Sequence, residues 1–147
     1  MTGEGNNATA GSAFAVLFLA WLVALASTLG ALFVGEVLGQ TPCLLCWYQR
    51  IAMFPLALIL GIACLRGDTA IARYALALAA AGALLAGWHV AVYTGLLPTE
   101  IEPCSAGPSC RGANMTILGG LPLPYLSLGA FAAICTLLLL VQRRQVT

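Results

Sequence analysis

The sequence predicts an all-α membrane protein, a bundle of four transmembrane helices that forms a single domain over residues 1–147. Of these residues 61% are hydrophobic and only 7% are charged, a composition that soluble domains do not have. Four uncharged runs are long enough for the roughly 20 residues that a spanning helix requires. The net charge of +1 indicates no nucleic-acid partner and no acidic one.

The four runs define the expected helices, at about residues 14–34, 46–65, 74–97 and 121–141. Pro55 falls inside the second run, where neighbouring helices satisfy the carbonyl that a proline frees. Small residues recur along the third run (ALALAAAGALLAG), which lets helix backbones approach closely. The prolines of LPLPYL suit the extended approach to a helix and its first turn. We therefore expect a compact bundle.

The connections between the runs differ in length. Only RGDTAIAR separates the second run from the third, which predicts a tight hairpin. The segment PTEIEPCSAGPSCRGANMTILGG separates the third run from the fourth. Because it is rich in Pro, Gly and Ser, we expect an irregular loop there.

The arginines predict the orientation of the bundle. Arg66 and Arg73 flank the short hairpin, and Arg143 and Arg144 end the chain, so four spans place all of them on one side. The positive-inside rule makes that side cytoplasmic. We therefore expect a multi-pass protein of the bacterial cell (inner) membrane, with both termini cytoplasmic and two extracytoplasmic loops that bear cysteines.

A cleaved signal peptide is the alternative for the first run. Residues 24–26, Ala-Leu-Ala, resemble a cleavage site, but the segment before the run carries Glu4 and no positive charge. Because signal peptides begin with a basic region, a membrane helix is the favoured interpretation.

The six cysteines fall into three pairs: Cys43 and Cys46 at the outer end of the second helix, Cys104 and Cys110 in the long loop, and Cys64 and Cys135 within apolar helix. The last pair we interpret as small buried hydrophobic residues. The other two pairs face the oxidising compartment, where disulfides persist.

The stretch TPCLLCWYQR has the features of a reactive thiol site. We expect Thr41 to cap a helix whose first position is Pro42, which places Cys43 and Cys46 in the first turn. Unpaired amides and the helix dipole favour a thiolate there, so a low thiol pKa is expected. Arg50 follows Cys46 by one turn on the same face and either stabilises an anion near that sulfur or extends to the headgroups.

Two other uses of these cysteines stay open at this point. The pattern C-x2-C followed by C-x5-C offers four thiolates to zinc, although the second spacing is wide and one pair belongs to a membrane helix. Two inert structural disulfides are the other alternative, but C-x-x-C in a helical turn makes a strained bond that is easily reduced. We expect no metal.

The sequence resembles the DsbB/BdbC family of membrane disulfide-generating oxidoreductases. The resemblance rests on CLLCWYQR at the start of the second of four helices and on a second cysteine pair between the third and fourth, and it covers essentially the whole chain. One departure is that PCSAGPSC separates the second pair by only five residues. Many DsbB proteins have a longer segment there, and the short form is similar to the BdbC branch. How this loop reaches the first pair is open.

The resemblance implies a relay of thiol–disulfide exchanges. A reduced DsbA-like thioredoxin-fold partner would attack Cys104 and release Cys110. The Cys110 thiolate would attack Cys43, and Cys46 would then pass electrons to a membrane quinone, ubiquinone or menaquinone, beside Arg50. The protein would draw on the lipid and quinone pool of the membrane. Because Cys104 and Cys110 lie on a Gly-Pro loop, we expect both to be accessible to a protein.

His89 lies on the third helix and is the only histidine. Family members with a histidine in this region suggest that it touches the quinone or relays a proton. The alternative is a histidine whose hydrogen bonds are satisfied within the bundle.

Two alternative functions remain. A vitamin K epoxide reductase-like enzyme shares the four-helix bundle and the quinone chemistry, but its C-x-x-C follows the loop pair, whereas here it comes first. A non-catalytic membrane protein with structural disulfides or zinc is the other.

Overall fold

A computed structural model describes residues 3–97, 110, 116–117 and 120–146. Its elements in chain order are α1 (Gly3–Leu32), the π-helical turn η1 (Phe33–Val37), α2 (Leu44–Arg66), the 3-10 turn η2 (Thr69–Ile71), α3 (Ala72–Tyr93), β1 (Thr116–Ile117), β2 (Leu121–Pro122) and α4 (Leu123–Val146).

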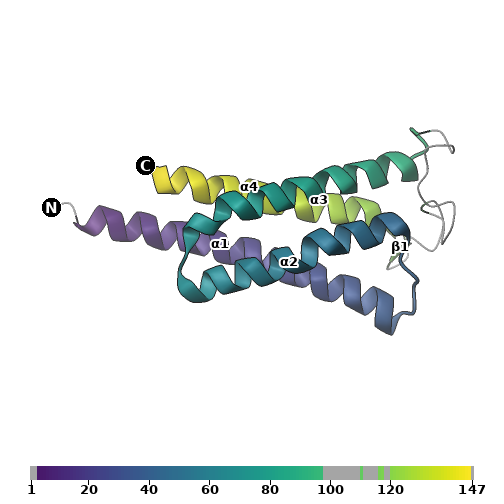
Figure 1. The fold of residues 1–147 in the computed structure, drawn as a ribbon, viewed down its shortest axis with the longest axis horizontal. Coiled ribbons are helices and arrows are strands. Elements are labelled where there is room, and N and C mark those ends of the chain that lie inside the picture. Colours follow the sequence, from purple (N-terminus) through teal and green to yellow (C-terminus); the bar gives the residue numbers. More distant parts are fainter. Residues whose placement is uncertain (1–2, 98–109, 111–115, 118–119, 147) are drawn as a thin grey trace.

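Four helical segments are long and apolar enough to cross a membrane: Gly11–Val37, Leu44–Arg66, Thr69–Tyr93 and Leu123–Gln145. Both ends of the chain lie at one end of the bundle together with the α2–α3 hairpin (Figure 1). The α1–α2 connection and the chain that enters α4 lie at the other end. The expected all-α membrane fold with four spans is confirmed.

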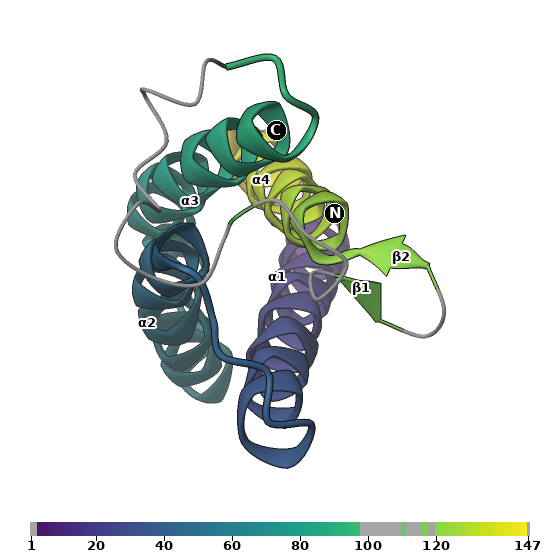
Figure 2. The ribbon, with the colours of Figure 1, turned by 90° about the vertical axis from the view of Figure 1, so that its right-hand side faces the viewer.

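The helices form a ring in which each one packs against two neighbours. α1 contacts α2 and α4, and α3 contacts the same two helices, as the end-on view shows (Figure 2). The largest fully buried apolar side chains of the core are Phe131, Leu17, Leu56, Leu60, Ile134 and Leu138. Large apolar side chains also cover the outer surface, which suits contact with lipid tails.

Gly82 allows the close approach of α3 and α4. It is buried, and a Cβ added there would overlap the ring of Phe131 on α4. Gly87, which follows on the same helix, would meet nothing within 4 Å. The glycine at position 82 is therefore required by packing, as the small residues of the third run predicted.

The helix ends differ from the expected ones by several residues. α1 extends back to Gly3, and α2 begins two residues early, at Leu44. α3 ends at Tyr93 instead of residue 97, because the chain leaves the helix through Gly95, whose φ of 77° is left-handed. α4 begins at Leu123 because the two residues before it pair as β2 with β1, a short antiparallel ladder that the sequence analysis did not predict.

We predict that Gly82→Ala lowers the stability of the bundle by about 1–3 kcal/mol, because an added methyl group forces the Phe131 ring away from α3. Thermal unfolding in detergent measures the change. Gly87→Ala is the matched control and should not lower the transition temperature, because its methyl group meets no neighbour. Equal transition temperatures for the two variants would contradict the packing role of Gly82.

Candidate functional site

Cys43 caps the N-terminus of α2. Its backbone is extended (φ −68°, ψ 169°), and its Sγ accepts a hydrogen bond from the Cys46 N–H at 3.3 Å. The expectation that Thr41 caps a helix starting at Pro42 is wrong, because the extended ψ of Cys43 delays the first turn until Leu44. The sulfur atom thus satisfies one of the amides that a helix start leaves unpaired.

The C-x-x-C pair consists of two free thiols in the structure. The Sγ atoms of Cys43 and Cys46 lie 2.9 Å apart, and Cys43 is fully buried whereas Cys46 is partly exposed. Hydrogen bonds with the Cys46 side chain, which has the largest effect, with His89 and with the Cys46 amide together lower the pKa of Cys43 from 9.0 to about 5, against the opposing effect of burial. Cys43 is therefore the thiolate of the reduced pair.

His89 reaches this pair from α3. It is 1% exposed, and its Nε2 lies 3.8 Å from the Cys43 Sγ. Its Nδ1 lies 3.0 Å from the Nε2 of Gln49, a buried side chain on α2. The ring therefore contacts the reactive sulfur with one nitrogen and is held by an amide with the other. His89 was predicted from the sequence as a candidate site residue, whereas Gln49 was not.

Cys110 lies against Cys43 and His89. It is fully buried and disulfide-bonded, and its Sγ, the Cys43 Sγ and a His89 ring nitrogen lie within 4.8 Å of one another. The expectation that a partner protein reaches Cys110 is wrong, because Cys43, Leu45 and Val92 enclose it in one apolar cluster. Its expected loop partner, Cys104, lies outside the described residues. A sulfur of the short loop thus reaches the first pair.

Arg50 is bound to α1. Its Nη2 donates to the Ala31 carbonyl at 2.7 Å, and its guanidinium lies over the Trp47 ring at 5.5 Å from the centroid. At Gly35 a Cβ would come within 3.1 Å of the same Nη2. The guanidinium therefore packs between the first turns of α2 and the outer end of α1, rather than extending freely to the headgroups.

These contacts give the two cysteines of the pair different surroundings. Cys43 faces His89 of α3 and Cys110, whereas Cys46 precedes Arg50 by one helical turn and shares its face of α2. The pair therefore connects a buried side, where a loop cysteine lies, with a partly exposed side that holds a cation.

A metal ion would need deprotonated ligands. The ligand atoms of Cys43, His89 and Cys110 are close enough to share one ion. However, the Cys110 sulfur belongs to a disulfide and offers no thiolate. The arrangement therefore fits thiol–disulfide exchange better than metal binding.

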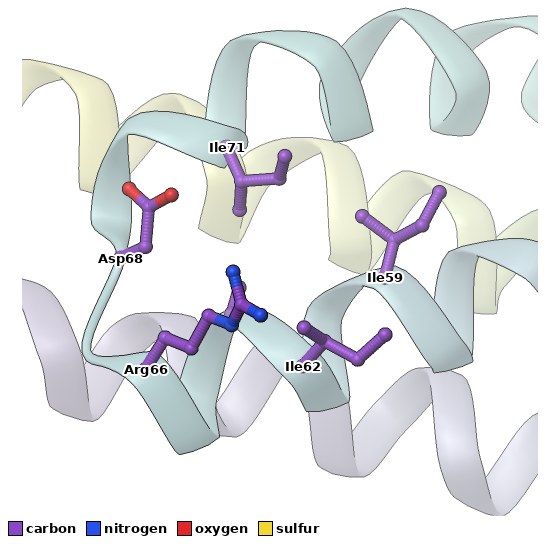
Figure 3. A pocket seen from close by; sticks show the side chains of 6 residues that line it. Ile59, Ile62, Arg66, Asp68 and Ile71 are labelled. Atoms are coloured by element: carbon purple, nitrogen blue, oxygen red, sulfur yellow. The ribbon is translucent and has the colours of Figure 1, made fainter.

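The remaining two cysteines, Cys64 and Cys135, are free thiols that pack against the central apolar core, away from this cluster. A separate hollow of about 240 Å³ opens at the opposite end of α2, beside the α2–α3 hairpin (Figure 3). Its lining combines isoleucines with one arginine and one aspartate: Ile59, Ile62, Ala63, Arg66, Asp68 and Ile71. It contains no cysteine and lies about 20 residues, or roughly 30 Å, along α2 from Cys43.

The chain matches the family model of the disulfide bond formation protein DsbB over residues 13–141. The chain belongs to the DsbB family. A probable disulfide formation protein of Metapseudomonas resinovorans is 55% identical over 140 residues, which cover 95% of this chain and 97% of that protein. The disulfide bond formation protein C of Bacillus subtilis (strain 168) is 40% identical over 126 residues, covering 86% and 91%. No solved structure matches the chain.

Membership of the DsbB family confirms the resemblance that the motifs indicated. The protein is a multi-pass membrane oxidoreductase of disulfide formation, and this activity involves a thiol–disulfide partner. The roles of Cys43, Cys46, Cys104, Cys110, Arg50 and His89 stay predictions.

We predict that the Cys43 thiol titrates near pH 5 in the reduced protein, because neighbouring hydrogen bonds stabilise its thiolate. The thiolate should persist above this pH and disappear below it. Ultraviolet thiolate absorbance against pH, in a variant with serine at positions 104 and 110, measures the midpoint.

The control for this titration is Cys43→Ser in the same variant, which should remove the transition. A thiol that ionises only above pH 8 would contradict the site geometry.

Proposed function

We propose that this DsbB-family protein oxidises a DsbA-like thioredoxin-fold dithiol and transfers the electrons to a membrane quinone. The partner loses two electrons and two protons when its disulfide forms, and a quinone supplies the matching acceptor of both. The contact of buried Cys110 with Cys43 carries the proposal, because it brings a loop sulfur to the membrane pair.

The relay begins at the loop pair. A partner thiolate attacks Cys104, so a partner–Cys104 bond forms and Cys110 leaves as a thiolate. Cys110 then attacks Cys43, and the Cys43–Cys46 bond breaks to leave a Cys46 thiolate. Burial of Cys110 supports this order, since a partner protein has no access to its sulfur.

The return exchange restores the loop pair. The second thiol of the partner resolves the mixed disulfide and frees Cys104. Cys104 then attacks Cys110, so that the Cys43–Cys110 bond breaks and Cys43 leaves as a thiolate. Free thiols at Cys43 and Cys46 and a disulfide at Cys110, as found in the structure, are what this step would leave, and they are consistent with the proposed order.

The residues around Cys46 fit a quinone. Cys46 is partly exposed at the membrane end of the pair, and Trp47, 51% exposed, offers an aromatic face to the lipid. Arg50 would donate hydrogen bonds to a quinone oxygen, and the lack of a side chain at Gly35 lets this guanidinium lie close to the outer end of α1. Arg50 and Trp47 are therefore the side chains that would hold the acceptor near Cys46.

Arg66 and Arg73 near the α2–α3 hairpin and the arginines at the end of α4 support a cytoplasmic position for that end of the bundle in the bacterial inner membrane. Both cysteine pairs then meet the oxidising compartment. A reporter fused after Thr69 that read as extracytoplasmic would overturn this orientation.

We predict that Cys110→Ser traps the partner on Cys104 as a mixed disulfide, because the sulfur that would expel the partner or pass the electrons on is missing. Cys104→Ser should trap little. Non-reducing electrophoresis after incubation with a reduced thioredoxin-fold protein measures the adduct. Cys64→Ser is the control and should behave as the wild type. A better trap in Cys104→Ser would reverse the assigned order.

We predict that Arg50→Ala raises the quinone KM roughly tenfold or more, since a hydrogen bond from a charged donor contributes about 1.5–3 kcal/mol. Partner trapping by the loop pair should change little. Quinone-dependent oxidation of the partner in nanodiscs measures the KM, and non-reducing electrophoresis measures the trapping.

Arg73→Ala removes an exposed arginine at the other end of the bundle and serves as the control for Arg50→Ala. An unchanged KM in folded Arg50→Ala protein would remove Arg50 from the quinone site. Absence of any quinone-dependent oxidation by the wild-type protein would reject the quinone proposal itself.

A further inference from the structure

Gln49 and His89 are buried polar side chains that contact each other. Gln49 is 7% exposed and His89 is 1% exposed, and they come from adjacent helices, α2 and α3. Burial of an amide and an imidazole in a membrane bundle costs free energy unless their polar atoms are paired. The contact of 3.0 Å between the Gln49 Nε2 and the His89 Nδ1 supplies such a pairing.

The contact of Gln49 with Nδ1 determines the hydrogen-bonding role of the other ring nitrogen of His89, Nε2. A neutral imidazole carries one donor and one acceptor nitrogen, and the partner of one determines the role of the other. The Gln49 Nε2 is an amide donor, so the His89 Nδ1 accepts and the ring proton resides on Nε2. That N–H faces the Cys43 sulfur, 3.8 Å away.

We propose that Gln49 is a positioning residue that fixes the tautomer and orientation of His89, so that the ring donates its Nε2–H to the Cys43 sulfur. The inference rests on the proposed relay for its functional meaning. When Cys104 attacks Cys110, the Cys104–Cys110 bond forms and the Cys43–Cys110 bond breaks. The electron pair of the broken bond stays on Cys43, where the His89 N–H stabilises it.

The position of Cys110 supports this role over a purely structural one. If Gln49 served only to satisfy the hydrogen bonding of a buried His89, no sulfur would be needed at the other ring nitrogen, Nε2. Here His89, Cys43 and Cys110 form one cluster within 4.8 Å, so the ring lies at the bond that must break. Among the described residues, the titratable side chains at this cluster are Cys46 from α2 and His89 and Tyr93 from α3, whereas Cys110 is in a disulfide and does not titrate.

Because His89 is the only histidine of the chain, labelling histidine with ¹⁵N gives the Nδ1 and Nε2 signals of one ring. We expect the reduced full-length protein in nanodiscs, without quinone or partner, to carry the proton on Nε2 with Nδ1 as a hydrogen-bond acceptor. A proton on Nδ1 would overturn the proposal. This measurement needs no substitution, so the folding of a variant does not affect it.

A double-mutant cycle on the Cys43 thiolate tests whether Gln49 acts through His89. Gln49→Leu and His89→Leu should each raise the titration midpoint by about one pH unit, a tenfold loss of thiolate below the midpoint. The double variant should shift no further than either single one. Gln142→Leu, at a partly buried glutamine on α4, is the matched control and should leave the midpoint unchanged.

An unchanged midpoint in Gln49→Leu, or additive shifts in the double variant, would overturn the proposal. Neither the tautomer nor the titration depends on an electron acceptor. A protein that failed to reduce quinone but showed both expected results would therefore reject the proposed acceptor and keep the role of Gln49.

Discussion

The site depends on the contacts of one atom, the Cys43 sulfur at the start of α2. This one atom caps a helix, lies 2.9 Å from the Cys46 sulfur, and meets His89 and Cys110 in a buried cluster. The contact of Cys43 with His89 requires α2 and α3 to stay adjacent at that end of the bundle. The close packing of α3 on α4 at Gly82 therefore supports the chemistry as well as the fold.

Burial separates the two halves of the proposed relay. Cys110 and Cys43 are inaccessible to a partner protein, whereas Cys46 is partly exposed beside a cation that α1 holds in place. In that relay a partner thiol would have to attack another loop sulfur, and an acceptor would have to approach from the side of Cys46. In the proposed relay the order of the exchanges would thus follow from which sulfur atoms are covered, because exchange requires direct attack of a thiolate on a sulfur.

The four spans and the reactive motif were predictable because hydrophobic length and C-x-x-C spacing are local properties of the chain. The role of Thr41 was not, because the choice of cap depends on the backbone of Cys43, whose extended ψ shifts the helix start to Leu44. Gln49 was missed because its burial depends on α3, forty residues away, and a lone glutamine after C-x-x-C carries no local signal. The enclosure of Cys110 likewise depends on Val92 and Leu45, which are distant in sequence.

The Cys43 sulfur both caps α2 and belongs to the thiol pair, so the stability of the helix start depends on the redox state of the pair. As a thiolate it is a strong acceptor for the Cys46 amide and suits the positive end of the helix dipole. In a disulfide with either Cys46 or Cys110 the same atom carries no charge, so the cap weakens in each oxidised state. The reduced pair is then the state in which the first turn of α2 is best stabilised. Packing of Leu45 and Val92 around the sulfur is independent of charge, and it would hold that turn in place during the proposed exchanges.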